Sequence, residues 1–334
     1  MISPDLPLID LHRHLDGSVR LTTILDVGQA YRLPLPAWTI EAMRPYVQVM
    51  EPQPGVLAFL ERFRWMTGIL VNESICTRVA YEAVEDCVRE GLDYAELRFS
   101  PWFMSQAHGL DPAAVVSAVV EGCKQASERY DFPVGITGII SRTYGADVAM
   151  KELNALLTCR DELVALDLAG DEAHFPADWF THVFKRARDA GWHITVHAGE
   201  SAGAESIWSA IRDLGAERIG HAVEAVKDPG LLDYMATRNI GIEANLTSNV
   251  QTSTVPDYPS HPLKRFLEAG IRASINTDDP GISAIDLPYE YHVAAPKAGL
   301  SPYQIRIAQE NALLTSFLPP DQQQRLREKK HETL

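Results

Sequence analysis

The chain contains 334 residues and is 46% hydrophobic, which is enough for one large domain or two ordinary ones with a substantial core. The formal net charge of −15, with no compensating cluster of lysine and arginine, argues against nucleic acid polymers and anionic membranes as partners. Four cysteines without C-x-x-C spacing, no apolar leader, and no apolar run near the ~20 residues of a membrane span favour a cytoplasmic protein with reduced thiols, while the oligomeric state stays open.

Eight short apolar runs predict β-strands along the chain. Their bounds are Leu8–His14, Tyr94–Ser100, Val134–Ser141, Leu163–Ala169, Ile194–Ala198, Arg218–Val223, Ile240–Ala244 and Ile271–Thr277. Most lack polar alternation, which is typical of a parallel sheet covered on both faces, and amphipathic helical patterns such as Pro112–Arg129 and Ala204–Leu214 lie between them. Eight strand-then-helix units favour an α/β fold of the (β/α)8 TIM-barrel type, and a doubly wound sheet is the alternative.

The segment between the first two predicted strands, residues 15–93, is too long for a single crossover connection. It contains the helical patterns Val56–Thr67 and Ile75–Arg89. We therefore expect a helical, lid-like insertion over the mouth of the barrel. No interdomain linker or internal repeat is visible, so residues 1–334 are interpreted as one domain.

The most informative motif is the pair His12 and His14 at the end of the first predicted strand. Residues i and i+2 of a strand project from the same face, so both imidazoles can reach one metal ion. His197 and Asp278 lie at the ends of later predicted strands, and in a barrel the carboxyl ends of all strands meet at one face. Three histidines and an aspartate form a ligand set that suits zinc, and the alternative for each single histidine is a hydrogen-bonded core residue.

Three more polar residues after predicted strands fit acid and base chemistry beside such a metal. A metal makes water nucleophilic near neutral pH, but protons must still be moved. His221 can orient the water or relay its proton, and Asp279 can accept one. Glu200 can donate a proton if burial or a neighbour such as Asp167 raises its pKa. The structural alternatives are a turn or N-cap residue for Asp279 and an exposed acid at a helix N-terminus for Glu200.

A second motif in the same region predicts different chemistry. Gly199–Gly203 reads G-E-S-A-G, which matches the G-x-S-x-G nucleophile elbow of serine hydrolases. Downstream, Asp278 or Asp279 and then His292 complete the chain order Ser, Asp, His around Ser201. No HGGG-type oxyanion segment precedes the motif, and it leaves the strand-end histidines unused. A serine esterase is therefore the remote alternative to a metal-dependent hydrolase.

Taken together, five segments resemble the adenosine deaminase family of the metal-dependent amidohydrolase superfamily. They are Ile9–Gly17, Asp167–Glu172, His197–Glu200, Arg218–His221 and Ser274–Pro280. The resemblance implies a (β/α)8 barrel with one zinc ion, and the implied ligands are His12, His14, His197 and Asp278. The predicted strand Leu163–Ala169 contains no lysine of the kind that bridges two metals in related barrels, which favours a single ion.

The resemblance also implies roles in the deamination of a purine nucleoside. Glu200 would protonate purine N1, while His221 and Asp279 would orient and deprotonate the attacking water. Gly170 would contact purine N3 through its backbone, and Asp16 would hold a ribose hydroxyl. The implied substrate-binding residues are His14, Asp16, Gly170 and Asp279. The implied reaction, part of purine salvage, converts adenosine and 2′-deoxyadenosine to inosine and 2′-deoxyinosine with release of ammonia.

Substrate choice within the family depends on the acid at position 16. Adenine deaminases usually carry Glu there, so Asp16 favours the nucleoside over the free base. Adenine or a modified adenosine is the nearest alternative substrate, and a non-catalytic nucleoside-binding protein is the alternative from another functional class. Two residues depart from the family pattern, namely Ala222, where Gly is common, and Asn245, where related bacterial enzymes often have Cys. We expect Ala222 to crowd the backbone of His221.

Overall fold

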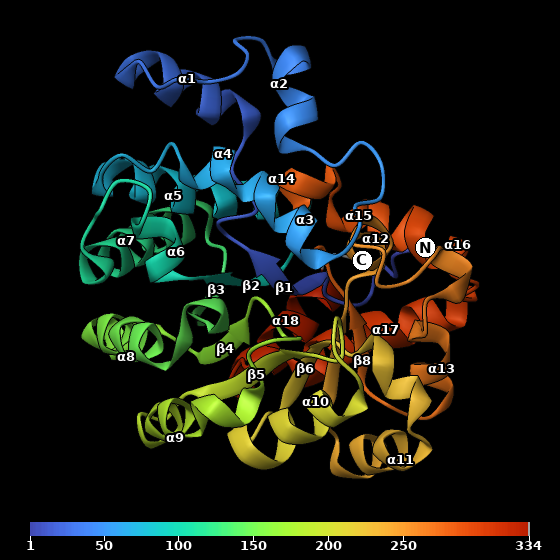
Figure 1. Ribbon diagram of the computed structural model, residues 1–334. Helices are drawn as coiled ribbons and strands as arrows, with labels where there is room; N and C mark the ends of the chain where they lie inside the picture. Colours follow the sequence, from blue (N-terminus) through green and yellow to red (C-terminus); the bar gives the residue numbers. More distant parts are fainter. Residues whose placement is uncertain (333–334) are drawn as a thin grey trace.

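The computed structural model describes residues 1–332 and contains a sheet of eight parallel strands in chain order (Figure 1). The strands are β1 Ile9–His14, β2 Tyr94–Phe99, β3 Val134–Ser141, β4 Ala165–Ala169, β5 His193–Ala198, β6 Arg218–His221, β7 Gly241–Ala244 and β8 Ala273–Ile275. Each strand pairs in parallel with the next. All eight predicted strands are present, with ends that differ by up to two residues from those expected.

Two backbone hydrogen bonds close the sheet. The N–H of His14 donates to the carbonyl of Asp278 at 2.7 Å, and the N–H of Asp278 donates to the carbonyl of His12 at 2.8 Å. This seam joins the first strand to the segment after the last one. The predicted (β/α)8 TIM-type barrel is therefore confirmed, and a doubly wound sheet, which would have free edges, is wrong.

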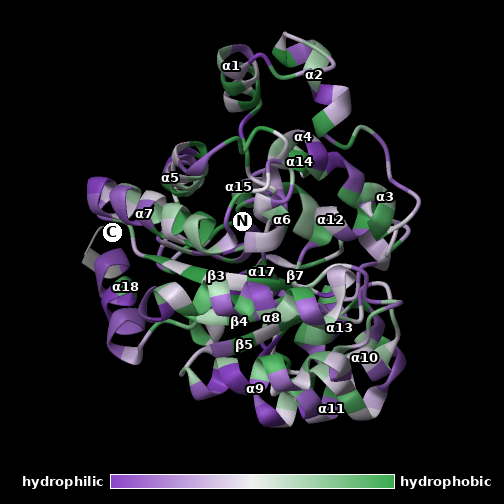
Figure 2. Ribbon diagram, turned by 60° about the vertical axis from the view of Figure 1, so that its left-hand side comes forward, coloured by the Kyte–Doolittle hydropathy of each residue, from purple (hydrophilic) through white to green (hydrophobic). Residues whose placement is uncertain are grey.

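Helices form the outer layer and the connections. They are α1 Leu21–Tyr31, α2 Ile40–Val47, α3 Val56–Leu60, α4 Arg64–Thr67, α5 Glu73–Arg89, α6 Pro101–Ser105, α7 Pro112–Tyr130, α8 Gly145–Leu156, α9 Thr181–Asp189, α10 Ala204–Ser209, α11 Pro229–Arg238, α12 Leu246–Gln251, α13 Leu263–Glu268, α14 Pro280–Ser283, α15 Leu287–Tyr289, α16 Ala295–Lys297, α17 Pro302–Thr315 and α18 Pro320–Glu332. Hydrophobic residues concentrate in the central strands, and hydrophilic residues lie along the outer helices (Figure 2). This distribution buries the amphipathic helices against the barrel.

The long predicted helix over residues 112–129 shows how local sequence sets these bounds. The side chain of Asp111 accepts a hydrogen bond from the backbone N–H of Ala113, and Pro112 occupies the first turn, where no N–H is needed. The helix ends at Asp131, whose φ of 50° is left-handed. Small and β-branched residues on one face, such as Val115 and Val119, are buried. The helix lies against α5 in the layer around the barrel (Figure 1).

Residues 15–93 contain five helices, α1 to α5. The predicted helix over residues 56–67 is a continuous series of short turns, in which the 3-10 turn Glu61–Phe63 links α3 and α4. Residues of this part, including Leu57 and Phe63, line a cavity at the barrel mouth, whereas α5 belongs to the outer layer. Lid motion remains a prediction.

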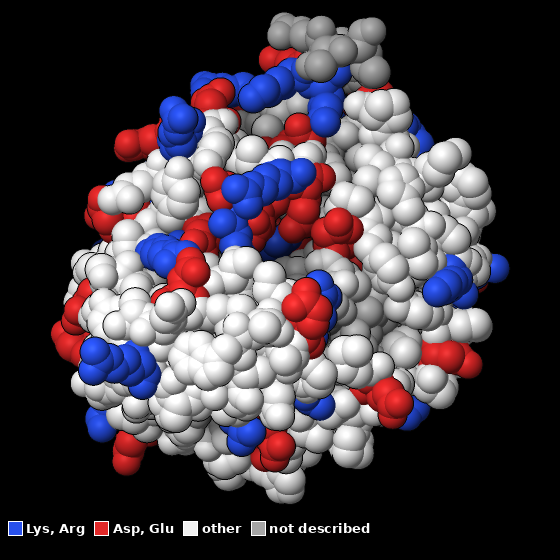
Figure 3. Space-filling model, turned by 90° about the horizontal axis from the view of Figure 1, so that it is seen from above, with Lys and Arg blue, Asp and Glu red and all other residues white. Residues whose placement is uncertain are grey.

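The charged side chains on the surface and the state of the cysteines agree with what the composition predicts. Positive and negative side chains are interspersed on the face seen from above (Figure 3). All four cysteines are free thiols. Within residues 1–332, no helix combines the length and apolarity that crossing a bilayer requires.

The barrel interior is more polar than the predicted strands suggested. Inward positions carry charged side chains that are almost fully buried, among them Glu96, Arg98, Asp167, Arg218 and Glu243. Arg98 donates to Asp167 at 2.9 Å and to Glu243 at 2.8 Å. Arg218 donates to Glu243 at 2.6 Å and also to Glu96. Because each cation contacts two carboxylates, this ion network compensates most of the cost of burying charge.

Candidate active site

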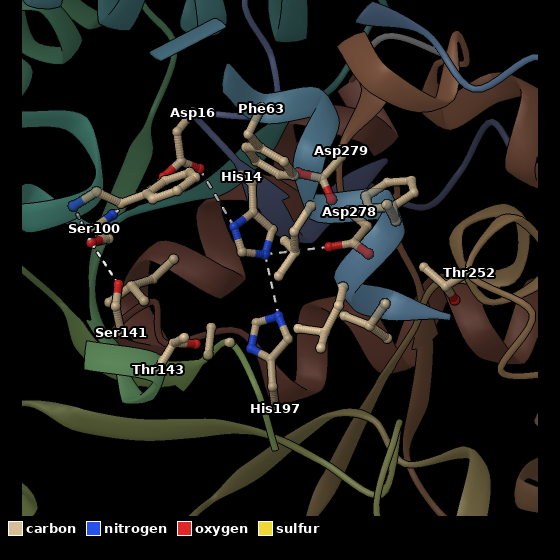
Figure 4. A pocket seen from close by; sticks show the side chains of 18 of the residues that line it. His14, Asp16, Phe63, Ser100, Ser141, Thr143, His197, Thr252, Asp278 and Asp279 are labelled. Atoms are coloured by element: carbon tan, nitrogen blue, oxygen red, sulfur yellow. Dashed lines mark hydrogen bonds and ion pairs between the residues drawn. The ribbon is translucent and has the colours of Figure 1, made fainter. Parts of the chain in front are cut away.

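Four side chains at the carboxyl ends of strands converge at the mouth of the barrel, three of which are labelled in Figure 4. His12 and His14 end β1, His197 lies near the end of β5, and Asp278 follows β8. The Nε2 atom of His197 lies 3.1 Å from Nε2 of His12 and 3.2 Å from Nε2 of His14. Oδ1 of Asp278 lies 3.1 Å from Nε2 of His12 and 3.3 Å from Nε2 of His14. The structure therefore brings the four predicted ligands together.

His12 and His197 face each other with ring nitrogens that carry no proton. Nδ1 of His12 donates to Glu243 at 2.7 Å, and Nδ1 of His197 donates to Asp167 at 2.9 Å. Burial lowers the pKa of His197 to about 3, in spite of the opposing effect of Asp167. With the ring protons on Nδ1, the two Nε2 lone pairs point at each other across 3.1 Å. A cation between them removes this repulsion, so the residues fit a metal ion.

His221 is a further donor near this point. Donor atoms of His12, His197, His221 and Asp278 lie within 4.8 Å of one another, and so do those of His14, Asp278 and Asp279. However, Nε2 of His221 is 3.8 Å from the nearer Asp278 oxygen, and His14 approaches His197 more closely. His14 rather than His221 therefore completes the tightest group.

The backbone around His221 is unusual. His221 has φ of 64° and Ala222 has φ of 55°, so two consecutive non-glycine residues are left-handed. Left-handed alanine is strained by about 1–2 kcal/mol, which explains why a glycine is common at the second position and what Ala222 costs here. Gly220 has a different reason, because a Cβ there would lie 2.9 Å from Cε1 of His12.

Glu200 lies on the loop after β5, and its carboxyl is buried beside the ligand group. Oε1 of Glu200 is 3.6 Å from Nδ1 of His221. Burial, followed by the charges of Asp278 and Glu172, raises the pKa of Glu200 to about 8. The alternative of an exposed acid at a helix N-terminus is therefore wrong. Asp167, which was considered as its neighbour, instead contacts His197 and Arg98.

Glu172, for which the sequence predicted no role, holds this loop. One oxygen accepts from the backbone N–H of Gly199 at 2.5 Å. The other accepts from the N–H groups of Glu200 at 3.1 Å, Ser201 at 2.8 Å and Ala202 at 3.1 Å. Four donors on one carboxylate fix the path of the chain that carries Glu200.

These bonds also remove the basis of the serine hydrolase interpretation. The N–H of Ala202, which follows the predicted nucleophile Ser201 and would contribute to an oxyanion hole, donates to Glu172, as does the N–H of Ser201 itself. Ser201 is exposed and is absent from the residues lining the main cavity, and His292 is exposed on a separate helical segment. The Ser, Asp, His constellation is not assembled within residues 1–332.

Asp279 and Asp16 point toward the same space as His14 (Figure 4). Asp279 occupies an N-cap position but makes no side-chain capping bond, so the capping alternative does not account for it. Burial and the adjacent Asp278 hold the pKa of Asp279 well above its usual range. Gly17 permits its approach, because a Cβ there would lie 1.9 Å from Oδ1 of Asp279. Oδ1 of Asp16 is 3.6 Å from Nδ1 of His14, and that oxygen has no hydrogen-bond partner.

A cavity of about 360 Å³ adjoins these residues, a size that suits a small organic ligand. Its polar lining comes from the strand ends, including Ser100, Ser141 and Gly170, and its apolar lining includes Leu57 and Phe63. Gly170 has φ of 108°, a conformation that favours glycine. The cavity therefore combines one apolar wall with convergent polar groups.

Several residues of the site were not predicted. Glu243 and Arg98 were not named, and Asp167 was expected beside Glu200, but together they hold the predicted histidine ligands. Asn249 was not named either, and it contacts His221, as does Asn245, which was noted only as a departure from the family pattern. A signal for the first group existed, since a charged residue inside a short buried strand needs a partner. The amide contacts depend on helix packing after β7, which the sequence pattern does not encode.

Solved structures show which class of barrel this is. The adenine deaminase of Arthrobacter aurescens superposes with a TM-score of 0.90 at 22% identity, covering 98% of this chain and 98% of that one. The N6-methyl-AMP deaminase of Arabidopsis thaliana gives a TM-score of 0.83 at 26% identity over 98% of this chain and 97% of that one. The fold is thus that of deaminase barrels.

Proteins similar in sequence identify the family more narrowly than the fold does. The adenosine deaminase family model matches residues 7–333. The adenosine deaminase of Edwardsiella ictaluri is 57% identical over 330 residues, 99% of each chain, and that of Yersinia enterocolitica is 54% identical over 329 residues, 98% of this chain and 99% of that one. The chain belongs to the adenosine deaminase family.

Proposed function

We propose that this protein is a zinc-dependent hydrolase that converts adenosine and 2′-deoxyadenosine to inosine and 2′-deoxyinosine with release of ammonia. The observation that carries the proposal is the buried, protonatable Glu200 beside four converging metal-type side chains at the wall of the cavity. An acid at this point can protonate a purine ring while water adds to the neighbouring carbon. The family of the relatives supports the same reaction.

The metal would be held by His12, His14, His197 and Asp278. Zinc favours such a set of imidazole and carboxylate ligands, and when bound it supplies the Lewis acidity that makes water nucleophilic near neutral pH. Glu243 and Asp167 would fix the histidine rings by accepting their Nδ1 protons.

The chain's own acids and bases would move the protons. Glu200 would donate to purine N1, which makes C6 electrophilic, and Asp279 would accept a proton from the water that attacks C6. His221 would orient that water. The amino group would take up the proton held by Asp279 and leave as ammonia. As C6 becomes a carbonyl carbon, its hydroxyl proton would replace the one that Glu200 gave. His14 and Asp279 line the cavity that would hold the substrate.

Nucleoside recognition is supported by the cavity lining. Asp16 has a buried oxygen without a partner, which suits a ribose hydroxyl, and Gly170 offers backbone atoms for purine N3. The part of the lining within residues 1–332 contains no lysine or arginine, and Glu61 adds a carboxylate. A 5′-phosphate would be repelled, so a nucleotide such as the substrate named for the Arabidopsis enzyme is disfavoured.

The direct test compares the rates at which several purine compounds are deaminated by purified protein whose metal content has been measured. Purified protein should convert adenosine and 2′-deoxyadenosine to their 6-oxopurine products much faster than adenine, N6-methyladenosine or adenosine 5′-monophosphate. Active protein without bound metal would contradict the zinc mechanism, and preference for adenine would favour the free-base alternative. We also propose a cytoplasmic location in purine salvage, with small nucleosides rather than nucleic acid or membranes as partners, which fractionation of cells can test.

A further inference from the structure

A chain of hydrogen bonds leads from the backbone of α13 to the ring of His221. The backbone N–H of Leu263 donates to Nδ1 of His261 at 3.1 Å. Nε2 of His261 lies 3.1 Å from Oδ1 of Asn249, and Nδ2 of Asn249 lies 3.0 Å from Nδ1 of His221. Asn249 is on α12, and all three side chains are at most 3% exposed.

The direction of every bond in this chain is fixed at its far end. A backbone N–H can only donate, so Nδ1 of His261 must be bare and its ring proton must lie on Nε2. That proton is donated to Oδ1 of Asn249, which leaves the NH₂ group of the amide facing Nδ1 of His221. Burial lowers the pKa of His261 to about 3, so the ring carries one proton only.

A second contact supports the same orientation of the amide. Nδ2 of Asn249 also donates to the hydroxyl of Thr254 at 3.0 Å, and that hydroxyl donates to the backbone carbonyl of Asn249 at 3.1 Å. Both amide protons are therefore used. The amide nitrogen of Asn245 lies 3.3 Å from Nδ1 and 3.4 Å from Nε2 of His221, so it does not distinguish the two ring nitrogens, and the contact with Asn249 decides between them.

We infer that Asn249, held by His261, is a positioning residue that fixes His221 as the Nε2–H tautomer. This inference rests on the proposed function and gives a structural reason for the separate tasks of His221 and Asp279. The only lone pair of His221 is covered by the amide, and its N–H faces Asp278 and the cavity. His221 can then donate a hydrogen bond to the water but cannot take its proton. Asp279 is left to accept it.

The first test uses the metal-loaded wild-type protein labelled with ¹⁵N-histidine. Nitrogen chemical shifts distinguish protonated from bare imidazole nitrogens, and the signals of His221 are identified by their loss in His221→Gln. We expect Nδ1 to be bare and Nε2 to carry the proton. A proton on Nδ1 overturns the inference.

The second test replaces the amide donor of Asn249 with a carboxylate acceptor. Asn249→Asp presents an acceptor to Nδ1, so the proton of His221 should move to Nδ1, and kcat should fall by about 10²- to 10⁴-fold with a smaller change in KM. Asn311→Asp is the control, because it places a carboxylate at another buried amide, one that donates to the carbonyl of Ala273. It should leave the His221 signals unchanged.

An unchanged tautomer in folded Asn249→Asp protein overturns the inference. If that variant does not fold, His261→Leu serves instead: without the donor that orients Asn249, His221 should show a mixture of tautomers, and a pure Nε2–H ring would overturn the inference. The nitrogen shifts need no substrate. A protein that shows the expected tautomer but does not deaminate adenosine would contradict the proposed function alone.

Discussion

Glu172→Gln tests whether one carboxylate holds the loop that carries Glu200. The change keeps shape but turns one oxygen into an NH₂ group, which must face at least one of the four N–H donors. A hydrogen bond to a charged acceptor contributes about 1.5–3 kcal/mol, and the remaining bonds weaken when the charge is lost. Since removing a buried charge offsets part of this, we expect the loop to lose about 2–4 kcal/mol of local stability.

Amide hydrogen exchange measures this loss directly. At about 1.4 kcal/mol per tenfold change, protection of residues 199–202 should fall roughly 30- to 1,000-fold. Displacement of Glu200 should lower kcat by about 10²-fold, because proton donation depends on placement within an ångström. Asp171→Asn is the matched control, since its carboxylate binds His174 rather than the loop of residues 199–202. Wild-type exchange and kcat in Glu172→Gln would refute the reasoning.

Glu172→Gln should also shift the pH profile of kcat/KM, and in one direction only. Burial, Asp278 and Glu172 raise the pKa of Glu200 to about 8, so the donating, protonated form is present below that pH and is lost above it. Removing the charge of Glu172 lowers this pKa. The basic limb of the pH profile of kcat/KM should therefore move to lower pH in Glu172→Gln, and a shift to higher pH would contradict the electrostatic role.

Four further outcomes are expected. Glu200→Gln should keep its metal, as metal analysis can check, yet lose about 10²- to 10⁴-fold in kcat, because an amide is no proton donor of comparable strength. Removal of metal by a chelator should abolish deamination and lower the melting temperature, since an ion at about 100 times its Kd stabilises the folded state by about 2.7 kcal/mol. Arg98→Met should lower the free energy of unfolding in urea by about 3–5 kcal/mol, because Asp167 and Glu243 lose a shared buried cation. Burial raises the pKa of Glu152 from 4.5 to about 7, so its contribution to stability is full below pH 4.5 and is lost as the pH rises through 7, and Glu152→Gln should flatten this decline in unfolding experiments at several pH values.

The sequence was sufficient to predict the fold because each strand ends in a recognisable way. His14, His197 and His221 lie at or near the carboxyl ends of their strands, and parallel barrels collect those ends at one face. The predicted ligands therefore converge without any knowledge of side-chain geometry. Boundaries were less certain where strands are short: β8 contains three residues, although seven were predicted.

The sequence pattern did not predict the polar side chains that hold the proposed site residues in place. Glu243 lies in the four-residue strand β7, and its four polar contacts come from four other strands. Glu172 was part of a recognised segment, but the donors that it binds lie 27 to 30 residues away. Such partners are chosen by packing rather than by local spacing. The same holds for the amide of Asn249, whose contact with His221 spans 28 residues.

The seam of the barrel has a consequence for the choice of ion. The two backbone bonds that close the sheet belong to His12, His14 and Asp278, which also carry proposed ligand atoms. An ion of unsuitable radius would pull on these side chains and thereby stretch or compress the joint between the first and last strands. We therefore expect the circumference of the sheet, in addition to the chemistry of the nitrogen and oxygen donors, to limit the range of ionic radii that the proposed site accepts. Selectivity for a metal becomes in this way a property of the whole barrel.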